Sequence, residues 1–398
     1  GKFVKQVPVP PEICSKVTAP ELVMSRHGDN SPGEMAPLRI GDLKLELPVI
    51  QAALSGYSDW PMRAIAREMG APYSIAEVAI DTFVNSLRNR QRTQHHLLVR
   101  EDDHPVGAQL TGTDPIQFAE AARCLSDAGF DVIDINFGCP AKRAAGRCRG
   151  GYHLGDPEKA IRILGAVREA VPAEIPVTVK MRRGVDDTDV SRARFFRILQ
   201  AAQSLGLAAA TVHCRTVEQK YVGPARWEFL SEVRDRFPEL TLLGSGDLFT
   251  AQDCVRMIRE TGVNGVTAAR GAIGNPWIYG HCRQLLQGKS NAAPPRISEQ
   301  RQVINRHFEL ARQVLPAAQY LRQVRKFCLF YAAWHPADNA VRDDFLRVRT
   351  SDDWEDVLNR WYSMDGAGQF PQNPGHLNRR STTLTDVADT SGRETVAE

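Results

Sequence analysis

The 398-residue chain carries a formal net charge of +3, 42% hydrophobic residues and eight cysteines, which is typical of a globular protein long enough for more than one domain. No apolar run approaches the roughly 20 residues that a membrane span requires, so we expect no membrane partner. Residues 1–46 lack the basic start and apolar middle of a signal peptide, and the cysteines are irregularly spaced without a CxxC pair, which indicates free thiols in a reducing cytoplasm.

Eight apolar, β-rich runs follow one another along the chain, with amphipathic segments such as 114–128, 157–171 and 250–261 between them. The runs are residues 47–54, 73–78, 105–111, 132–139, 176–181, 209–215, 240–246 and 265–270. The intervening segments open with capping or turn residues, as helices do. Eight β-α units predict a TIM barrel over residues 47–290.

The pattern changes to helices alone after the eighth unit. Residues 298–314, 317–334 and 351–364 are the clearest helical segments, and they predict a smaller all-helical domain over residues 291–365. Residues 1–46 are expected to form an N-terminal extension. Residues 366–398 are rich in Gly, Pro, Asn, Ser and Thr, so we expect a disordered tail.

Polar side chains stand at the ends of the predicted strands, where a TIM barrel places its chemistry. They are Gln109, Asn136, Cys139, Lys180, Arg182, His213, Arg215, Asp247 and Arg270, and the last two have the neighbouring glycines Gly246 and Gly271. A lysine at the end of a buried strand is costly to desolvate unless it meets an anion or an electron-rich acceptor. Lys180 is therefore a candidate ligand-binding residue, with a salt bridge to a carboxylate as the structural alternative.

Cys139 lies in the turn Gly138-Cys139-Pro140, directly after an apolar strand. Glycine allows a sharp turn and proline ends the strand, so the thiol is expected to be presented at the rim. The alternative is a buried cysteine that acts as a small hydrophobe. Glycines after the seventh and eighth strands, together with Arg270, indicate a phosphate site.

Five motifs in this order resemble the dihydrouridine synthase family, over roughly residues 47–335. They are Asp134-Ile-Asn-Phe-Gly-Cys-Pro-Ala-Lys142, Val177-Thr-Val-Lys-Met-Arg182, Val212-His-Cys-Arg-Thr216, Gly246-Asp247 and Arg270-Gly-Ala-Ile-Gly-Asn-Pro-Trp-Ile278. The segment 325–334 resembles the basic and aromatic helix of the family's RNA-binding domain. The resemblance implies an enzyme that holds FMN in its barrel and uses NADPH to reduce uridine to 5,6-dihydrouridine in RNA, with tRNA as the expected substrate.

The resemblance also implies roles for individual residues. Cys139 takes the role of the proton donor to C5 of the uracil, opposite the hydride delivered to C6. The flavin would be held by Ala53, Leu54, Ser55, Gln109, Lys180, His213, Ser245, Gly246, Asp247, Ala269 and Arg270. The substrate would be bound by Asn136, Arg182, Arg322, Arg325 and Lys326, the last three spaced to share one face of a helix. We expect a monomer with no obligate protein partner and no metal site.

Some positions depart from the family pattern. The family's Ala-Pro-Met-Ala-Gly is here Ala52-Ala-Leu-Ser-Gly56, Ser245 replaces an Asn, and Ala269 replaces a Gly. The loop 146–154 is divergent and contains Arg147, Arg149 and a second thiol, Cys148, which competes with Cys139 for the catalytic role. Two other functions stay open: a small-molecule flavin reductase with a TIM barrel, and a non-catalytic RNA-binding homologue.

Overall fold

The protein is described here from a computed structural model, which covers residues 37–87, 99–140, 150–289 and 292–372. Eight parallel strands close into a barrel in the order β10-β3-β4-β5-β6-β7-β8-β9. The strands are β3 (Val49–Gln51), β4 (Ser74–Ile80), β5 (Val106–Thr111), β6 (Val132–Phe137), β7 (Val177–Arg182), β8 (Ala209–His213), β9 (Leu242–Ser245) and β10 (Gly265–Ala268). The predicted TIM barrel is confirmed.

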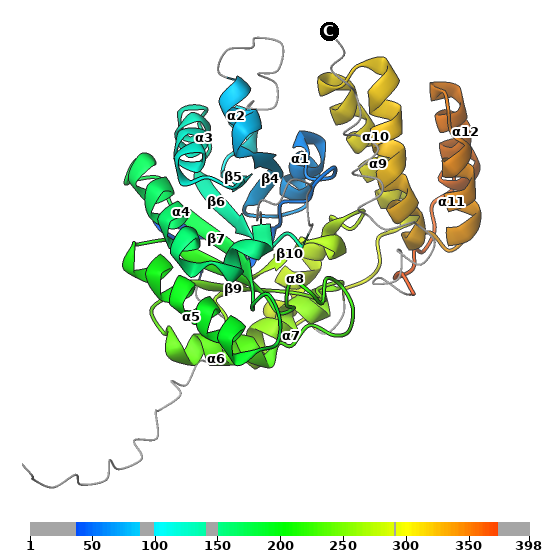
Figure 1. Cartoon of the computed structure of the whole chain (residues 1–398). Helices are drawn as coiled ribbons and strands as arrows, with labels where there is room; N and C mark the ends of the chain where they lie inside the picture. Colours follow the sequence, from blue (N-terminus) through cyan, green and yellow to red (C-terminus); the bar gives the residue numbers. More distant parts are fainter. Residues whose placement is uncertain (1–36, 88–98, 141–149, 290–291, 373–398) are drawn as a thin grey trace, which may run out of the picture.

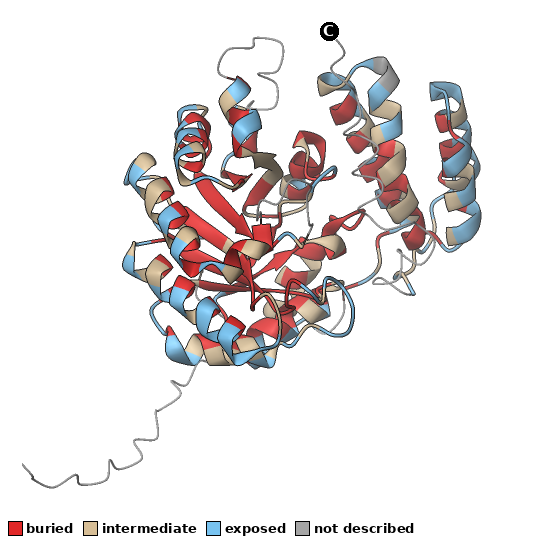
Figure 2. Ribbon diagram, viewed as in Figure 1, coloured by how far each residue is buried: buried red, intermediate tan, exposed pale blue. Residues whose placement is uncertain are grey.

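Helices surround the barrel, with exposed outer faces around buried strands (Figure 2). They are α1 (Trp60–Glu68), α2 (Asp81–Leu87), α3 (Pro115–Asp127), α4 (Pro157–Ala170), α5 (Asp189–Ser204), α6 (Glu228–Arg236), α7 (Ala251–Thr261) and α8 (Ile278–Leu286). The local sequence explains their ends. In α7, for example, Thr250 and Asp253 form a capping box, and Gly262 ends the helix in the left-handed conformation at φ +71°.

A short hairpin closes the amino-terminal end of the barrel. Strands β1 (Leu38–Ile40) and β2 (Leu43–Leu45) pair antiparallel, and their apolar side chains pack against Tyr73 and Val132 at the start of the barrel strands. Residues 38–45 therefore belong to the barrel core, although the sequence predicts only an extension over residues 1–46. Residues 1–36 of that extension lie outside the described part.

The second region contains only helices and stands beside the barrel (Figure 1). It consists of α9 (Ile297–Val314), α10 (Ala317–Tyr331), the 3-10 turn η5 (Ala332–Trp334), α11 (Asp338–Arg347) and α12 (Ser351–Trp361). The helical character was predicted, but α11 was not. Its core is aromatic: the rings of Phe308 and Trp354 stack at 4.6 Å between centroids, and Phe345 lies 5.6 Å from Trp354.

Specific polar contacts fix the helical region against the barrel. Arg306 on α9 forms an ion pair with Glu68 on α1 at 2.7 Å, and the Gln323 amide on α10 donates to Asp59 at 2.8 Å. The Trp334 indole donates to the carbonyl of Gly274 in the loop after β10 at 2.9 Å. The two regions therefore share one continuous interface along α1, α9, α10 and the β10–α8 loop.

The segment after α12 returns to this interface. The N–H of Ile297 donates to the Gly366 carbonyl at 3.0 Å, and the N–H of Gln369 donates to the Trp334 carbonyl at 2.9 Å. Residues 366–372 are thus packed against the helical region, which corrects the prediction that a disordered tail begins at residue 366. Residues 373–398 lie outside the described part. Within the described residues, no helix is both long and apolar enough to cross a bilayer.

Candidate active site

The inner face of the barrel changes from apolar to polar along its axis. Near the amino-terminal end it is lined by Ile50, Tyr73, Ile75, Val132, Ala209 and Leu243. Toward the carboxyl-terminal rim the same alternation of side chains presents Gln109, Asp134, Asn136, Thr178, Lys180, Arg182, Thr211 and His213. Because side chains on a strand alternate in direction, these polar groups face the barrel interior together. The rim is therefore a polar site above an apolar floor.

A chain of buried hydrogen bonds connects three strands below Cys139. The Thr178 hydroxyl donates to Asp134 at 2.6 Å, and the Gln109 amide donates to the other oxygen of that carboxylate at 2.7 Å. The Asn136 amide donates to the Gln109 oxygen at 2.8 Å. Burial raises the pKa of Asp134, whereas the bonds from Thr178 and Gln109 lower it. The chain fixes each amide orientation, so Asn136 presents its own oxygen to the turn that follows.

That oxygen organises the turn that carries the thiol. Asn136 Oδ1 accepts hydrogen bonds from the N–H groups of Gly138 at 2.9 Å and Cys139 at 3.0 Å. Cys139 itself is exposed, so the predicted presentation of the thiol at the rim agrees with this geometry. One amide N–H and the side-chain oxygen of Asn136 thus form hydrogen bonds within the protein. The contact of Asn136 with substrate stays a prediction, and the structure adds a role for Asn136 in positioning Cys139.

Two glycines let the chain pass close to Cys139 from the other side. The 3-10 turn η3 (Gly150–Gly155) begins at Gly150 with φ +54°, and Gly151 donates its N–H to the Cys139 carbonyl at 2.9 Å. A Cβ added at Gly150 would lie 2.8 Å from Cys139 Cβ. The two glycines of the divergent loop therefore allow the chain to pack closely against Cys139. Arg147, Cys148 and Arg149 of that loop lie outside the described residues.

Replacing Gly150 with alanine is expected to destabilise the protein by about 3 kcal/mol, because a left-handed alanine costs about 1–2 kcal/mol and the contact with Cys139 adds overpacking. Gly129→Ala is the matched control, since Gly129 has φ +95° but nothing within 4 Å of an added Cβ. Urea unfolding of both variants measures the difference. Equal losses of stability in the two variants would contradict the proposed close contact.

Lys180 lies in the middle of this constellation. A Cβ added at Gly138 would lie 3.5 Å from Lys180 Nζ, so the ammonium group sits next to the Gly-Cys-Pro turn. Although Lys180 keeps some accessible surface, burial lowers its pKa to about 8, with a further lowering by Arg182. No salt bridge to Lys180 is found among the described residues. The charge of the Asp134 carboxylate nevertheless acts on Lys180 and raises its pKa against these two effects, so Lys180 lies near a carboxylate without forming the salt bridge of the structural alternative.

The neighbouring strand ends concentrate positive charge at the rim. Burial, and then the charges of Lys180, Arg182, Arg215 and Arg270, hold the pKa of His213 well below its ordinary value. His213 is therefore neutral at physiological pH. Four cationic groups around one neutral imidazole make a site that favours an anionic ligand.

Asp247 partly balances this charge, and it does so through protein contacts. Both of its carboxylate oxygens accept from Arg215, at 2.7 and 2.8 Å, and one also accepts the N–H of Ala225 at 2.9 Å. Arg270 lies farther from the carboxylate, at 3.8 Å. The Asp247 side chain therefore orients Arg215 and the β8–α6 loop.

The backbone after β9 and β10 comes close to the barrel axis. Gly246 has φ +120°, and a Cβ there would lie 3.1 Å from His213 Nδ1 and 2.8 Å from Ala225 Cβ, so only glycine fits. His213 Nδ1 and Arg215 Nη1 are buried and have no hydrogen-bond partner among the described residues. Buried polar atoms are rarely left unpaired. Together with Ser245, Ala269 and Arg270, these groups form a cradle with unpaired polar atoms.

The other predicted site residues differ in their surroundings. Ala53 and Leu54 are half-buried and Ser55 is exposed in the loop after β3, so their cofactor contacts stay predictions. Arg182 is 1% exposed, and it donates to the carbonyls of Gly138, Thr216 and Lys220 at 2.7–2.8 Å. This placement makes Arg182 a brace between the cysteine turn and the β8–α6 loop.

The three predicted RNA-binding residues on α10 diverge in direction. Lys326 bonds the Gly56 carbonyl of the barrel and lies 4.3 Å above the Tyr57 ring, so its ammonium group is used at the interface. Arg325 donates to the Val348 carbonyl at 2.8 Å, whereas Arg322 is exposed. Arg322 and Arg349 both lie close enough to Arg325 to lower its pKa, after the effect of burial. We call Arg322, Arg325 and Arg349 the basic cluster.

Sequence reasoning missed several residues that build the site. The buried pair Thr178 and Asp134 were not singled out, although both alternate with apolar residues on strands that end at the site, which is a usable signal. Tyr221 was also missed: its exposed ring lies 4.6 Å from the guanidinium of Arg270 and 5.5 Å from that of Arg182. Nothing in the local sequence indicates that contact.

Comparison with known proteins identifies the family. The family model described as Dihydrouridine synthase (Dus) matches residues 50–362. The chain is 31% identical over 359 residues to a probable tRNA-dihydrouridine synthase of Mycobacterium tuberculosis (strain CDC 1551 / Oshkosh), covering 88% of this chain and 90% of the relative. It is 33% identical over 317 residues to tRNA-dihydrouridine synthase B of Xanthomonas axonopodis pv. citri (strain 306), covering 79% and 92%.

Among solved structures, morphinone reductase in complex with tetrahydroNAD has a TM-score of 0.48 at 14% identity, over 67% of this chain and 93% of that chain. The match to the family model spans the barrel and the helical region described above. The alignments with the two relatives include 90% and 92% of the relatives' own length. The chain belongs to the dihydrouridine synthase family of enzymes.

Proposed function

We propose that the protein uses FMN and NADPH to reduce uridine to 5,6-dihydrouridine in RNA, and that tRNA is its substrate. The observation that carries the proposal is the meeting of an exposed cysteine with a half-buried lysine at a positively charged barrel rim. Relatives that bear the name tRNA-dihydrouridine synthase support the choice of reaction and RNA.

The residues at the rim fit a flavin mononucleotide. The cradle of Ser245, Gly246, Ala269 and Arg270 offers close backbone and positive charge for a phosphate. The unpaired atoms His213 Nδ1 and Arg215 Nη1 need polar partners that a ligand would provide. Gln109 and Lys180 would then contact the ring system. When bound and reduced, FMN supplies the hydride that C6 of the uracil receives.

The chain's own residues supply the proton and the electrostatics. A thiol is an acid of suitable strength to protonate C5, and Cys139 is held at the rim by Asn136 and Gly151. The ammonium group of Lys180 stabilises negative charge next to that turn. Arg182 keeps the turn in place through the Gly138 carbonyl. Proton transfer and charge stabilisation thus come from adjacent strand ends.

The purified protein is expected to be yellow, with one FMN bound noncovalently, because the cradle offers both positive charge and unpaired polar atoms. After reduction by NADPH, it should convert uridine in an unmodified tRNA transcript to dihydrouridine, as detected by nucleoside mass spectrometry. A protein that binds no added FMN would overturn the proposal. A flavoprotein that reduces free pyrimidines but not RNA would favour a small-molecule reductase instead.

RNA binding is expected to depend on the basic cluster. Reversing two charges in Arg322→Glu/Arg349→Glu should weaken tRNA affinity. The slope of log affinity against log salt concentration should also become shallower, by about 0.7–0.9 for each phosphate that the variant no longer neutralises. The reason is that every neutralised phosphate releases counterions. Flavin reduction should be unchanged, because Arg325 and Arg349 form their hydrogen bonds with the Val348 and Leu346 carbonyls of the helical region and not with the rim cradle. The measurement is tRNA affinity by filter binding between low and moderate salt.

The control for this experiment is Arg162→Glu/Arg259→Glu, which makes the same charge change at exposed barrel helices. Only a loss of affinity greater than that of the control supports the basic cluster. An unchanged affinity would move the RNA surface elsewhere, for example to Lys142, Arg143, Arg147 and Arg149, which lie outside the described residues.

A further inference from the structure

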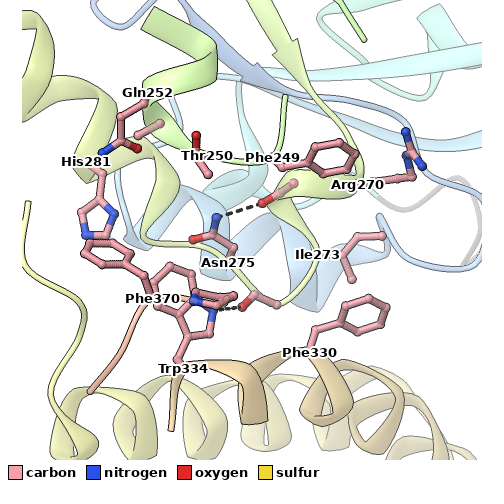
Figure 3. A pocket seen from close by; sticks show the side chains of 14 residues that line it. Phe249, Thr250, Gln252, Arg270, Ile273, Asn275, His281, Phe330, Trp334 and Phe370 are labelled. Carbon is pink, nitrogen blue, oxygen red and sulfur yellow. Dashed lines mark hydrogen bonds between the residues drawn. The ribbon is translucent and has the colours of Figure 1, made fainter. Parts of the chain in front are cut away.

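A cavity lies away from the cysteine turn, at the junction of the barrel and the helical region. It has a volume of about 140 Å³. Its walls come from the loops after β9 and β10, the start of α7, His281 on α8, the end of α10 with η5, and the segment after α12 (Figure 3). Arg270 of the rim cradle also contributes to its lining. The cavity therefore adjoins the candidate active site without being part of it.

Four aromatic side chains contribute to the walls, and contacts within the protein hold them in place. The Trp334 indole is held by its bond to the Gly274 carbonyl at 2.9 Å. The Phe370 ring lies 5.9 Å from both Trp334 and His281, and Phe249 and Phe330 complete the lining. Phe370 is 44% exposed, so this wall is also part of the molecular surface. The walls offer preformed flat surfaces of the kind on which an aromatic ligand stacks.

Asn275 provides an unused acceptor at the same place. Its side chain is 9% exposed, and its Nδ2 donates to the Gly271 carbonyl at 2.9 Å. Its Oδ1 has no partner among the described residues, and Figure 3 shows this oxygen on the side away from that bond, among the lining side chains. Because a buried acceptor without a partner is costly, the site is suited to a ligand that donates a hydrogen bond.

The charges around the cavity select an uncharged ligand. Burial lowers the pKa of His281, so its ring is neutral at pH 7. The Asp253 carboxylate in the first turn of α7 accepts the N–H groups of Phe249 and Thr250, and so places a negative charge behind these two lining residues. The guanidinium of Arg270 lies between Tyr221 and Phe249 and faces Asp247. The lining thus combines a neutral imidazole with a guanidinium that already faces a carboxylate, and a neutral heteroaromatic ring fits these surroundings.

We propose that this cavity binds a nucleobase. Its volume is smaller than the roughly 300 Å³ at which pockets for drug-sized ligands begin, so it accepts one ring system and no more. Stacking on aromatic walls and one hydrogen bond to Asn275 match how proteins hold a base turned out of a nucleic acid stack. Two sources share this chemistry: a base of the RNA and the adenine of NADPH. The choice between these sources rests on the proposed function, whereas the binding chemistry does not.

The test is photolabelling of the full-length protein with 8-azidoadenosine or 4-thiouridine, followed by peptide mass spectrometry. The expected result is labelling within the peptides that contain Trp334 or Phe370. Phe370→Ala should raise the nucleoside concentration for half-maximal labelling about five- to a hundredfold, as expected when one stacking partner is removed. Phe83→Ala is the matched control, because Phe83 is similarly exposed at 41% but lies on α2, which does not line the cavity.

Competition identifies the source of the base. Loss of labelling on adding tRNA assigns the cavity to an RNA base, and loss on adding NADPH assigns it to the adenine. Labelling confined to other peptides, equal labelling of Phe370→Ala and wild type, or labelling that neither competitor displaces would overturn the proposal. Dihydrouridine formation is measured separately on the same preparation, so a failure of the proposed function does not affect this readout.

Discussion

Cys139→Ala is expected to abolish dihydrouridine formation while FMN binding and reduction by NADPH stay near normal. Reduction of the flavin needs no acid for C5 of the uracil, so the first half of the reaction does not involve the thiol. The second half does, and proton transfer by a positioned acid is typically worth about a hundred- to ten-thousandfold in rate. The measurement is single-turnover oxidation of the reduced enzyme by tRNA, monitored through flavin absorbance.

The matched variant for this experiment is Cys148→Ala, because Cys148 is the other thiol that the sequence brings into question. It lies outside the described residues, and it should retain most of the activity. Cys139 is the better candidate because Asn136 and Gly151 fix its backbone at the rim. If Cys139→Ala oxidised normally with tRNA while Cys148→Ala did not, the acid would reside in the loop 146–154 and the assignment of Cys139 would be wrong.

The barrel and the position of its chemistry could be predicted because their signals are local. Each apolar run is long enough to identify a strand, and parallel strands bring their carboxyl ends to one rim. Lys180, His213 and Arg270 could therefore be grouped from the sequence. In the structure, the charges of Lys180 and Arg270 act on the neutral imidazole of His213. The glycine at position 246 was informative for the same reason, since its φ of +120° is a local requirement.

What could not be predicted depends on partners distant in sequence. Spacing suggests that Arg322, Arg325 and Lys326 share a face, but the tertiary environment gives Lys326 the Gly56 carbonyl and Arg325 the Val348 carbonyl. Arg182 looks like a rim residue, yet its guanidinium fits three backbone carbonyls from two loops. The hairpin of β1 and β2 is only three residues per strand, which is too short to leave a periodic pattern.

Lys180→Met is expected to slow flavin reduction and uridine reduction about a hundred- to a thousandfold, which is the loss typical when one preorganised electrostatic group is removed. The same variant should be more stable than the wild type when both are free of flavin. Burial disfavours the ammonium form and lowers the Lys180 pKa from 10.5 to about 8. Such a shift corresponds to a stability cost of about 3 kcal/mol at most, and methionine removes the charge with an unbranched side chain that is only one heavy atom shorter.

The pH dependence of this gain identifies its cause. Below pH 8 Lys180 is protonated in both the folded and the unfolded chain, so the full cost of burying the charge is present. Between pH 8 and 10.5 the unfolded chain binds more protons than the folded one, and the wild type gains stability relative to the variant as pH rises. The stability difference between Lys180→Met and wild type should therefore be largest near pH 7 and shrink above pH 8, as measured by urea unfolding of the flavin-free proteins.

Bound FMN should also reduce the difference in stability between Lys180→Met and wild type, because an anionic ligand compensates the ammonium group. A variant that is less stable than wild type at pH 7, or a difference that does not change with pH, would show that the Lys180 charge is already compensated within the protein.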